Sequence, residues 1–294
     1  MVKNLVLLPC HSVWIPATQG CSEYGFNRDE WELVDFQIEG FDHYSFIEQI
    51  LKALMKANST AIVIISGGFT KKNTPEISES KSYFALMKKY YDALSDHIEL
   101  AMLEALISKT RSQDLIRTYD RFKNTKLSDI CFENVYCEEY ALDSFENLYY
   151  ALAYYRFLNA EIIFNELRSV TIVGFKFKET RFTDLHWKYL GCLNKLSDCQ
   201  LIFDSNMPNT LDEKTNSKFA NNVFDSERKY GYNFFLKDPF GRMDNLYLKK
   251  NKRNFLKISA YQNAPFKQYL IEFNQHSSDV ETLHQIECSL YDGV

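Results

Sequence analysis

Short runs of apolar residues, separated by amphipathic stretches, organise this chain. Four runs read as buried strands, at residues 5–8, 61–65, 170–173 and 200–203, and a weaker fifth candidate spans 132–136. The run at 61–65 (Ala-Ile-Val-Ile-Ile) shows no alternation of polar and apolar positions. Such a run is typical of a strand that helices cover on both faces, as in a parallel sheet.

Helical periodicity fills the intervals between these runs. Residues 43–57 place apolar side chains at spacings of three and four on one face, and residues 83–94, 97–108 and 144–158 are predicted helices as well. Strands that alternate with helices are typical of right-handed β-α-β crossovers. The pattern therefore predicts an α/β fold, a Rossmann-like three-layer α/β/α architecture with a mostly parallel sheet.

The chain reads as a single α/β domain over residues 1–294, because no Pro/Gly/Ser-rich linker and no internal repeat divides it. Residues 9–42 are long for a connection, and long segments of this kind are usually functional or disordered. Their aromatic content argues against disorder, so we expect an insertion that folds over the sheet edge. A polar C-terminal extension begins at about residue 206. The rings of the insertion are Trp14, Tyr24, Phe26, Trp31 and Phe36.

Composition narrows the class of protein further. The net charge of −5 disfavours a nucleic-acid partner, which needs an extended basic face. The seven cysteines are odd in number and form no C-x-x-C pair, so free thiols in a reducing compartment are expected. No apolar stretch approaches the roughly 20 residues of a membrane span, and the N-terminal apolar run is too short for a signal peptide. A cytoplasmic protein without a membrane partner is predicted.

Ligands of open parallel sheets bind beyond the carboxyl ends of the strands, so the residues there are the candidate chemistry. Ser66, Gly67 and Gly68 follow the second strand, and a helix begins near Glu79. Paired glycines let backbone N–H groups approach a ligand, and a helix start favours an anion. The alternative is a plain turn. Neither G-x-G-x-x-G nor a P-loop is present, so no nucleotide fingerprint supports the first reading.

A second polar corner follows the third strand. Glu138, Ser144, Glu146 and Asn147 crowd the junction between this strand and the next helix. Asp143 and Glu146 have the spacing of a capping box, which is the structural reading of this corner. A dense polar corner at a strand end also suits a general base, a metal ligand or a ribose-binding carboxylate.

Basic residues follow the fourth strand, and a histidine follows the first. If the segment stays extended, alternation puts Lys176 and Lys178 on one side, where they could bind a phosphate or carboxylate together with Arg181. The alternative is a solvated surface. His11 is a candidate acid or base, or a structural histidine. The basic run at residues 249–254 is predicted to be a solvated surface rather than an anion site.

In this order, these blocks resemble the domain-of-unknown-function family 218, and within it the long fungal branch. The resemblance implies a Rossmann-like fold with a polar pocket at the strand ends, and it implies no agreed reaction. Bacterial members carry a histidine between the last strand and the arginine, where this chain has Phe177 and Lys178. The matching blocks are Ser66-Gly67-Gly68, Ser78-Glu79-Ser80, residues 138–147, residues 173–178 with Arg181 and His186, and residues 249–254.

The leading hypothesis is an enzyme, a hydrolase or transferase, that acts on a phosphorylated or otherwise anionic small molecule. The backbone of Gly67 and Gly68 would hold the anion together with the three basic residues after the fourth strand. Glu138, with Glu146 and Asn147, would supply acid/base chemistry or bind a divalent metal such as Mg²⁺, and His11 would be a second acid or base.

Two alternatives stay open. The first is a protein that binds a nucleoside-type cofactor such as S-adenosylmethionine, since Rossmann-like folds often hold the ribose with an acidic residue after a strand. The second is a non-catalytic interaction protein that uses residues 9–42 and 206–230. Exposed Trp14 and Trp31 would support this second alternative, and burial of both would count against it.

Overall fold

The computed structural model describes residues 2–16, 23–110, 112–159, 167–193, 196–208 and 213–270. Its five strands form one sheet in the order β3-β2-β1-β4-β5, and every pairing is parallel. The predicted α/β fold with a parallel sheet is therefore confirmed. The strands are β1 (Asn4–Pro9), β2 (Ala61–Ser66), β3 (Val135–Glu138), β4 (Ser169–Phe175) and β5 (Gln200–Asn206).

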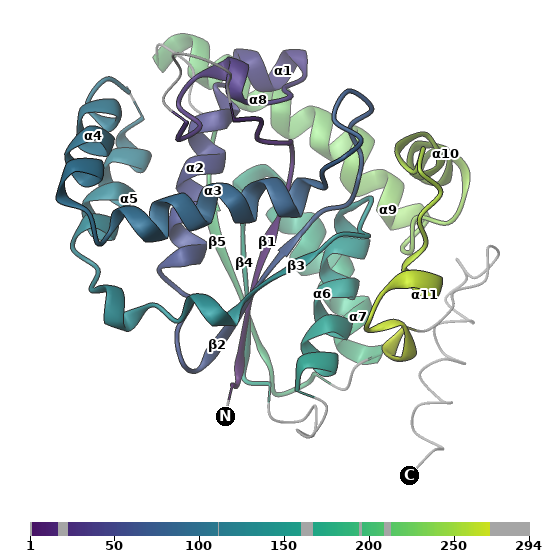
Figure 1. Cartoon of the computed structure of the whole chain (residues 1–294). Helices are drawn as coiled ribbons and strands as arrows, with labels where there is room; N and C mark the ends of the chain where they lie inside the picture. The colour runs from purple at the N-terminus through teal and green to yellow at the C-terminus, as the bar shows by residue number, and fades with distance from the viewer. Residues whose placement is uncertain are drawn as a thin grey trace.

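Helices cover both faces of this sheet, which gives the predicted Rossmann-like α/β/α layers (Figure 1). Side chains of a strand alternate between its faces, so Val6 and Leu8 join one core while Leu5 and Leu7 join the other. The first core packs α2 (Asp42–Leu54), α3 (Glu79–Ala93), α4 (His97–Ile107) and α5 (Gln113–Lys123). The second packs α6 (Ser144–Leu158), α7 (Trp187–Leu193), α9 (Asn233–Lys237), α10 (Asp244–Arg253) and α11 (Ala260–Asn263).

The carboxyl ends of the strands all lie at one edge of the sheet, the upper edge in Figure 1, near α1 (Asp35–Glu39) and α8 (Glu213–Glu227). From β1 the chain builds outward through β2 and β3 on one side and through β4 and β5 on the other. The strand order therefore reverses between β1 and β4. Open α/β sheets bind ligands in the crevice at such a reversal.

The insertion at residues 9–42 packs against the core, apart from residues 17–22, which lie outside the described part. Trp14 and Trp31 pair through an isolated antiparallel bridge, and both are buried. The carboxylate of Glu30 accepts hydrogen bonds from Trp14 Nε1 at 3.3 Å and from the amide of Gly25 at 2.7 Å. Phe36, by contrast, is 54% exposed. Burial of the two tryptophans counts against the interaction-protein alternative.

Three local predictions need correction. The weak third strand begins at Val135 and ends at Glu138, because residues 132–134 form a 3-10 turn instead. Lys176–Lys178 is also a 3-10 turn rather than an extended segment. Helix α5 was not predicted, although its amphipathic pattern buries Leu115, Tyr119 and Phe122. Further single turns are Arg28–Glu30, Leu127–Asp129, Arg181–His186, Arg228–Tyr232 and Lys267–Tyr269.

Several sequence expectations concern the chain as a whole. Cys10, Cys131, Cys137 and Cys199 are free thiols, and the side chains of Cys21, Cys192 and Cys288 lie outside the described part. Within the described ranges, none of the helices has the length and apolar character that crossing a membrane requires.

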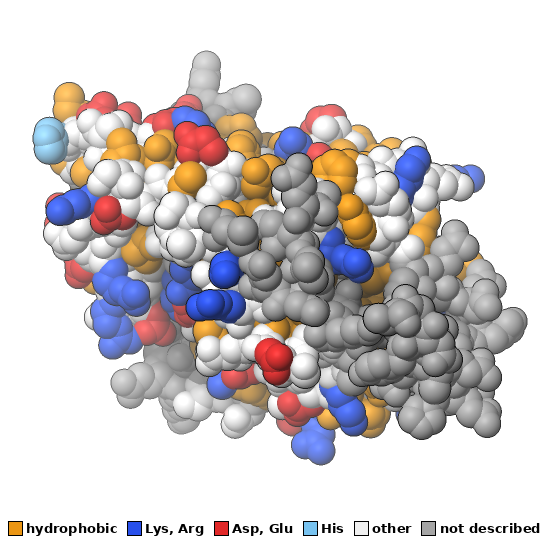
Figure 2. Space-filling view, turned by 90° about the horizontal axis from the view of Figure 1, so that it is seen from below, with side chains coloured by type: hydrophobic (Ala, Val, Ile, Leu, Met, Phe, Trp, Pro, Cys, Tyr) orange, Lys and Arg blue, Asp and Glu red, His pale blue; other side chains and the backbone are white. Residues whose placement is uncertain are grey.

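Figure 2 looks onto the amino-terminal ends of the strands, where basic and acidic side chains are interspersed. Of the extension from about residue 206, residues 209–212 and 271–294 are not described.

Candidate functional site

Basic side chains from two distant segments meet beside His11 at the carboxyl edge of the sheet. Lys178 and Arg181 follow β4, and Lys249 and Arg253 come from the last turns of α10. Burial, and then the charges of Lys178, Arg181 and Arg253, lowers the pKa of His11 well below its ordinary value. Lys249 is exposed to solvent, but partial loss of hydration, and then Arg253 and Arg181, lowers its pKa to about 8. We call Lys178, Arg181, Lys249 and Arg253 the cation cluster.

His11 and Lys178 are in direct contact. Lys178 Nζ lies 3.1 Å from His11 Nδ1, and the imidazole stacks on Phe175 with a centroid distance of 5.1 Å. When Lys178 is charged its ammonium can only donate, so Nδ1 accepts and the hydrogen of the neutral imidazole then sits on Nε2. His11 Nε2 is buried and has no hydrogen-bond partner in the described part of the chain. His11 thus presents an unused donor at the reversal of strand order.

The cation cluster carries more positive charge than its neighbours neutralise. Arg181 Nε forms an ion pair with Glu227 at 3.2 Å, and Glu227 is the one carboxylate in an ion pair with the cluster among the described residues. Arg253 Nη1 donates to the carbonyl of Leu142 at 2.6 Å. Burial, and then Arg181, lowers the pKa of Lys178 to about 7. Cations that depress one another's pKa values in this way favour a bound anion.

Two further buried polar atoms near this site lack a partner in the described part of the chain. They are Oδ1 of Asp42, at the start of α2, and the hydroxyl of Tyr83 in α3. Burial raises the pKa of Asp42 to about 8, although Lys178 opposes this shift. Each unsatisfied polar atom costs about 1–3 kcal/mol, so such atoms mark places for a ligand or water. Sequence reasoning missed both residues, because a helix-start Asp and a core-spaced Tyr carry no distinguishing signal.

The Ser-Gly-Gly segment joins strand ends to each other. The amide of Gly67 donates to Glu138 O at 3.0 Å, and the amide of Gly68 donates to Ala141 O at 2.8 Å. The carbonyls of the two glycines accept from the first amides of α3, those of Glu79 and Ser80, at 3.1 and 3.0 Å. The backbone donors that were expected to hold an anion are therefore already used. Close approach of backbone to backbone explains the glycines, as the sequence pattern allowed.

Glu79 is buried beneath this segment. The hydroxyl of Thr70 donates to its carboxylate, and burial raises the pKa of Glu79. Arg253, Lys71 and Lys178 act in the opposite direction on that pKa. Glu79 therefore lies at the margin of the cation cluster, where it is already bonded to protein.

Glu138 is fully buried and ties together three elements. One carboxylate oxygen accepts the amides of Tyr140 and Ala141 at 2.6 and 3.1 Å, and the other accepts the hydroxyl of Ser66 at the end of β2. Asn147 Nδ2 of α6 donates to both the hydroxyl and the carbonyl of Ser66 at 2.9 and 3.0 Å. Burial raises the pKa of Glu138 to about 8. The geometry gives Glu138, Ser66 and Asn147 a framework role, since none faces the cation cluster with an unused atom.

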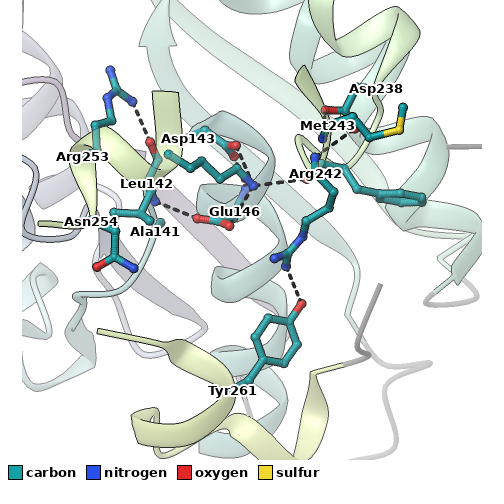
Figure 3. Close-up of polar contacts among 12 residues, drawn as sticks. Ala141, Leu142, Asp143, Glu146, Asp238, Arg242, Met243, Arg253, Asn254 and Tyr261 are labelled. Atoms are coloured by element: carbon teal, nitrogen blue, oxygen red, sulfur yellow. Dashed lines mark hydrogen bonds and ion pairs between the residues drawn. The ribbon is translucent and has the colours of Figure 1, made fainter. Parts of the chain in front are cut away.

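A buried ion-pair network follows β3 (Figure 3). Lys250 Nζ lies 2.9 Å from Asp143 Oδ2 and 2.8 Å from Glu146 Oε1. Half of the predicted capping box is present, because the amide of Glu146 donates to Asp143 Oδ1 at 2.9 Å. Glu146 Oε2 accepts, also at 2.9 Å, from the amide of Leu142, which is the residue before the N-cap Asp143. Both carboxylates are therefore engaged by the protein itself. Among the described residues, no group of three or more His, Cys, Asp or Glu side chains is arranged for a metal ion.

The prediction of a solvated surface at residues 249–254 is wrong for Lys250 and Arg253. Lys250 is only 6% exposed, and Arg253 bonds the chain at Leu142. A run of charged residues has the same sequence whether helix α10 faces solvent or packs on α6. Only the tertiary structure shows which of its side chains are buried. Lys176 shows the converse, because it is exposed and pairs with Glu179 instead of joining Lys178. The 3-10 turn at 176–178 rotates the two lysines apart.

Ser144, the first residue of α6, contacts a histidine that the sequence places 42 positions later. Its Oγ lies 2.8 Å from Nε2 of His186, which is fully buried. Of the predicted site residues, the structure thus gathers His11, Lys178 and Arg181, with Ser144 on the adjoining helix. Ser66, Gly67, Gly68, Glu138, Glu146 and Asn147 form the frame behind them.

Comparisons with known proteins yield one relative. No family model matches the chain, and no solved structure matches it. A protein of Saccharomyces cerevisiae, named "Uncharacterized protein YOR238W", is 30% identical over 273 residues, which cover 90% of this chain and 88% of the yeast protein. The name of the relative states no activity and no ligand. The resemblance to domain-of-unknown-function family 218 stays a prediction.

Proposed function

The chain belongs to the family of the yeast protein YOR238W, and from its geometry we propose that it is an enzyme, a hydrolase or transferase, that acts on a phosphorylated or otherwise anionic small molecule. One observation carries the proposal. Lys178 contacts His11, and the charges of Arg181 and Arg253 act on it as well, at the reversal of strand order. Lys249 acts in turn on Lys178, and a single carboxylate among the described residues pairs with these four cations.

Binding follows from the charges. Arg181 and Arg253 stay protonated and can bind an oxyanion through two N–H groups at once. Burial, and then neighbouring cations, holds the pKa values of Lys178 and Lys249 at about 7 and about 8, and an anion between the arginines offsets the repulsive part of this effect. His11 Nε2 supplies a further donor without changing its charge. Fixed donors and cations of this kind stabilise the charge that develops as a phosphoryl or acyl group is transferred.

The proposal retains two predictions from the sequence. We place the protein in the cytoplasm, where thiols such as Cys10 and Cys137 stay reduced. We also keep the resemblance to domain-of-unknown-function family 218, whose polar strand-end pocket would correspond to the cation cluster.

Thermal unfolding in the presence of ligands tests the proposal. The panel contains inorganic phosphate, pyrophosphate, nucleotides, sugar phosphates and S-adenosylmethionine, with and without Mg²⁺. A ligand at 100 times its dissociation constant adds about 2.7 kcal/mol to the free energy of unfolding, a shift of several degrees. We expect phosphates to give this shift and Arg181→Ala to remove it. Lys176→Ala is the matched control, because Lys176 lies on the same segment but faces solvent.

Two other results would each contradict the proposal. A shift caused by S-adenosylmethionine alone would favour the cofactor-binding alternative over an enzyme for phosphates. The absence of any shift, with the protein folded, would favour the interaction-protein alternative despite the buried Trp14 and Trp31.

A further inference from the structure

A serine and a histidine form a hydrogen-bonded pair at the junction of β3 and α6. Ser144 opens this 15-residue helix, and its Oγ lies 2.8 Å from Nε2 of His186. Ser144 is half-buried, while His186 is fully buried. A hydroxyl within hydrogen-bond reach of an imidazole nitrogen is the arrangement of an activated nucleophile.

Aromatic rings fix the imidazole in this position. Phe145, Phe182 and Phe235 meet the ring of His186 edge to face, at centroid distances of 5.8, 5.4 and 4.6 Å. His186 Nδ1 is buried and has no hydrogen-bond partner within the described ranges. The three rings therefore hold the imidazole in place with Nε2 toward Ser144.

The pair adjoins the cation cluster. Arg181 is close enough to lower the pKa of His186. Asp143, the residue directly before Ser144, is close enough to Lys249 to raise its pKa against the dominant effects of burial and neighbouring cations. The guanidinium of Arg181 lies over the ring of Phe235, 5.5 Å from its centroid, and the same ring contacts His186 at 4.6 Å. An anion bound by Arg181 would therefore lie close to the serine–histidine pair.

The surrounding charges suit a base that works only when substrate is present. Burial, and then the charges of Arg181 and Lys250, lowers the pKa of His186 well below its ordinary value, so the imidazole is neutral and able to accept a proton. A bound phosphoester brings negative charge next to these cations. That charge stabilises the imidazolium formed when the serine loses its proton.

We propose that Ser144 is a nucleophile, that His186 is its general base, and that together they transfer the phosphoryl group of a phosphoester held by the cation cluster. This inference rests on the function proposed above. Ser144 Oγ attacks phosphorus while its proton passes to Nε2 of His186, and the proton then goes to the departing ester oxygen. Water next attacks the phosphoserine, the Oγ–P bond breaks, and a proton of that water returns through Nε2 to Oγ.

A fluorophosphonate probe on the full chain tests the nucleophile directly. The Oγ–P bond forms as fluoride leaves, so labelling needs no knowledge of the natural substrate. Mass spectrometry of the digested protein should find the label on the peptide that contains Ser144. Ser144→Ala should remove the label, and His186→Gln should slow labelling about 100-fold, the contribution of a general base.

Ser112→Ala is the matched control. Ser112 likewise lies at the start of a helix, α5, where its hydroxyl accepts the amide of Leu115, and we expect this variant to be labelled at the wild-type rate. A label on another residue, or no label on folded wild-type protein, would overturn the proposal. If His186→Gln fails to fold, the position of the label on the wild-type chain still shows whether Ser144 is the nucleophile.

The two proposals fail separately. Loss of labelling together with a phosphate-induced thermal shift would leave the anion site standing and remove the nucleophile. Labelling of Ser144 without any thermal shift would support the nucleophile and remove the anion site.

Discussion

Nζ of Lys178 lies 3.1 Å from Nδ1 of His11, so a residue that follows β4 bonds a residue that follows β1. The two strands are neighbours in the sheet, although β1 ends at Pro9 and β4 begins only at Ser169. When Lys178 is charged, the contact places the hydrogen of His11 on Nε2, which has no partner among the described residues. It also places a cation with a depressed pKa at the centre of the candidate site.

Replacing Lys178 should stabilise the protein in a pH-dependent way. In the folded state, burial and then Arg181 lower its pKa from 10.5 to about 7. Below pH 7 the ammonium is charged in both states, and its charge opposes folding in full. Between pH 7 and 10.5 the folded state has lost the proton while the unfolded state retains it, so this cost falls as pH rises. Lys178→Met should therefore raise the unfolding temperature at about pH 6 and have little such effect at about pH 10.

Lys176→Met controls for the loss of a surface charge from the same turn, and we expect little change at either pH. A stabilisation by Lys178→Met that grows toward high pH would contradict the assignment.

Binding of inorganic phosphate should be accompanied by proton uptake. At about pH 8, Lys178 and Lys249 are partly deprotonated, because their pKa values are about 7 and about 8. A bound anion raises both values, so protons move from the buffer to the protein. Calorimetric titration in two buffers with different ionisation enthalpies measures how many protons the protein takes up on binding. Equal apparent binding enthalpies in both buffers would show that the two lysines do not face the anion.

Glu138→Ala should lower the free energy of unfolding by about 3 kcal/mol, because three buried donors lose their acceptor. Glu138→Gln should cost only about 1 kcal/mol. The amide keeps an oxygen for the amides of Tyr140 and Ala141, and it resembles the protonated carboxyl that burial favours through a pKa of about 8. Urea unfolding compares both variants with Glu133→Ala, an exposed position. Equal losses for Gln and Ala would argue against the framework role.

Lys250→Met should destabilise the chain by about 3–5 kcal/mol, since it leaves two buried carboxylates without their cation. Adding Asp143→Asn and Glu146→Gln to the same protein should recover part of this loss. Lys252→Met, on the exposed side of α10, should stay within about 0.5 kcal/mol of wild type. A small effect of Lys250→Met would mean that water reaches the two carboxylates.

Two glycines should respond oppositely to alanine. A Cβ at Gly68 would lie 3.0 Å from the backbone oxygens of both Ala141 and Glu139, so Gly68→Ala should cost about 1–3 kcal/mol. A Cβ at Gly191, within α7, would meet nothing nearer than 3.8 Å. Gly191→Ala should therefore stabilise the chain by about 0.5–1 kcal/mol through helix propensity. Thermal unfolding of both variants checks the sign of each change.

The fold was predictable because its signals are local. A run such as Ala61–Ser66 reports burial on both faces by composition alone, and the spacing of apolar residues in α2 and α6 defines their buried sides. The helix cap at Asp143, whose side chain accepts the amide of Glu146, was also predictable, since it links residues only three apart.

Only the tertiary structure decided which polar side chains meet. Lys250 bonds Glu146 across 104 positions, Lys178 bonds His11 across 167, and Ser144 bonds His186 across 42. Burial then decides whether each charge is paired or solvated. The sequence by itself determined the strands, the helices and the edge of the sheet where polar residues gather, because hydrophobic periodicity acts over a few residues. The composition of the site depends on contacts between distant segments and on the low polarity around them, and neither quantity is encoded in a local pattern.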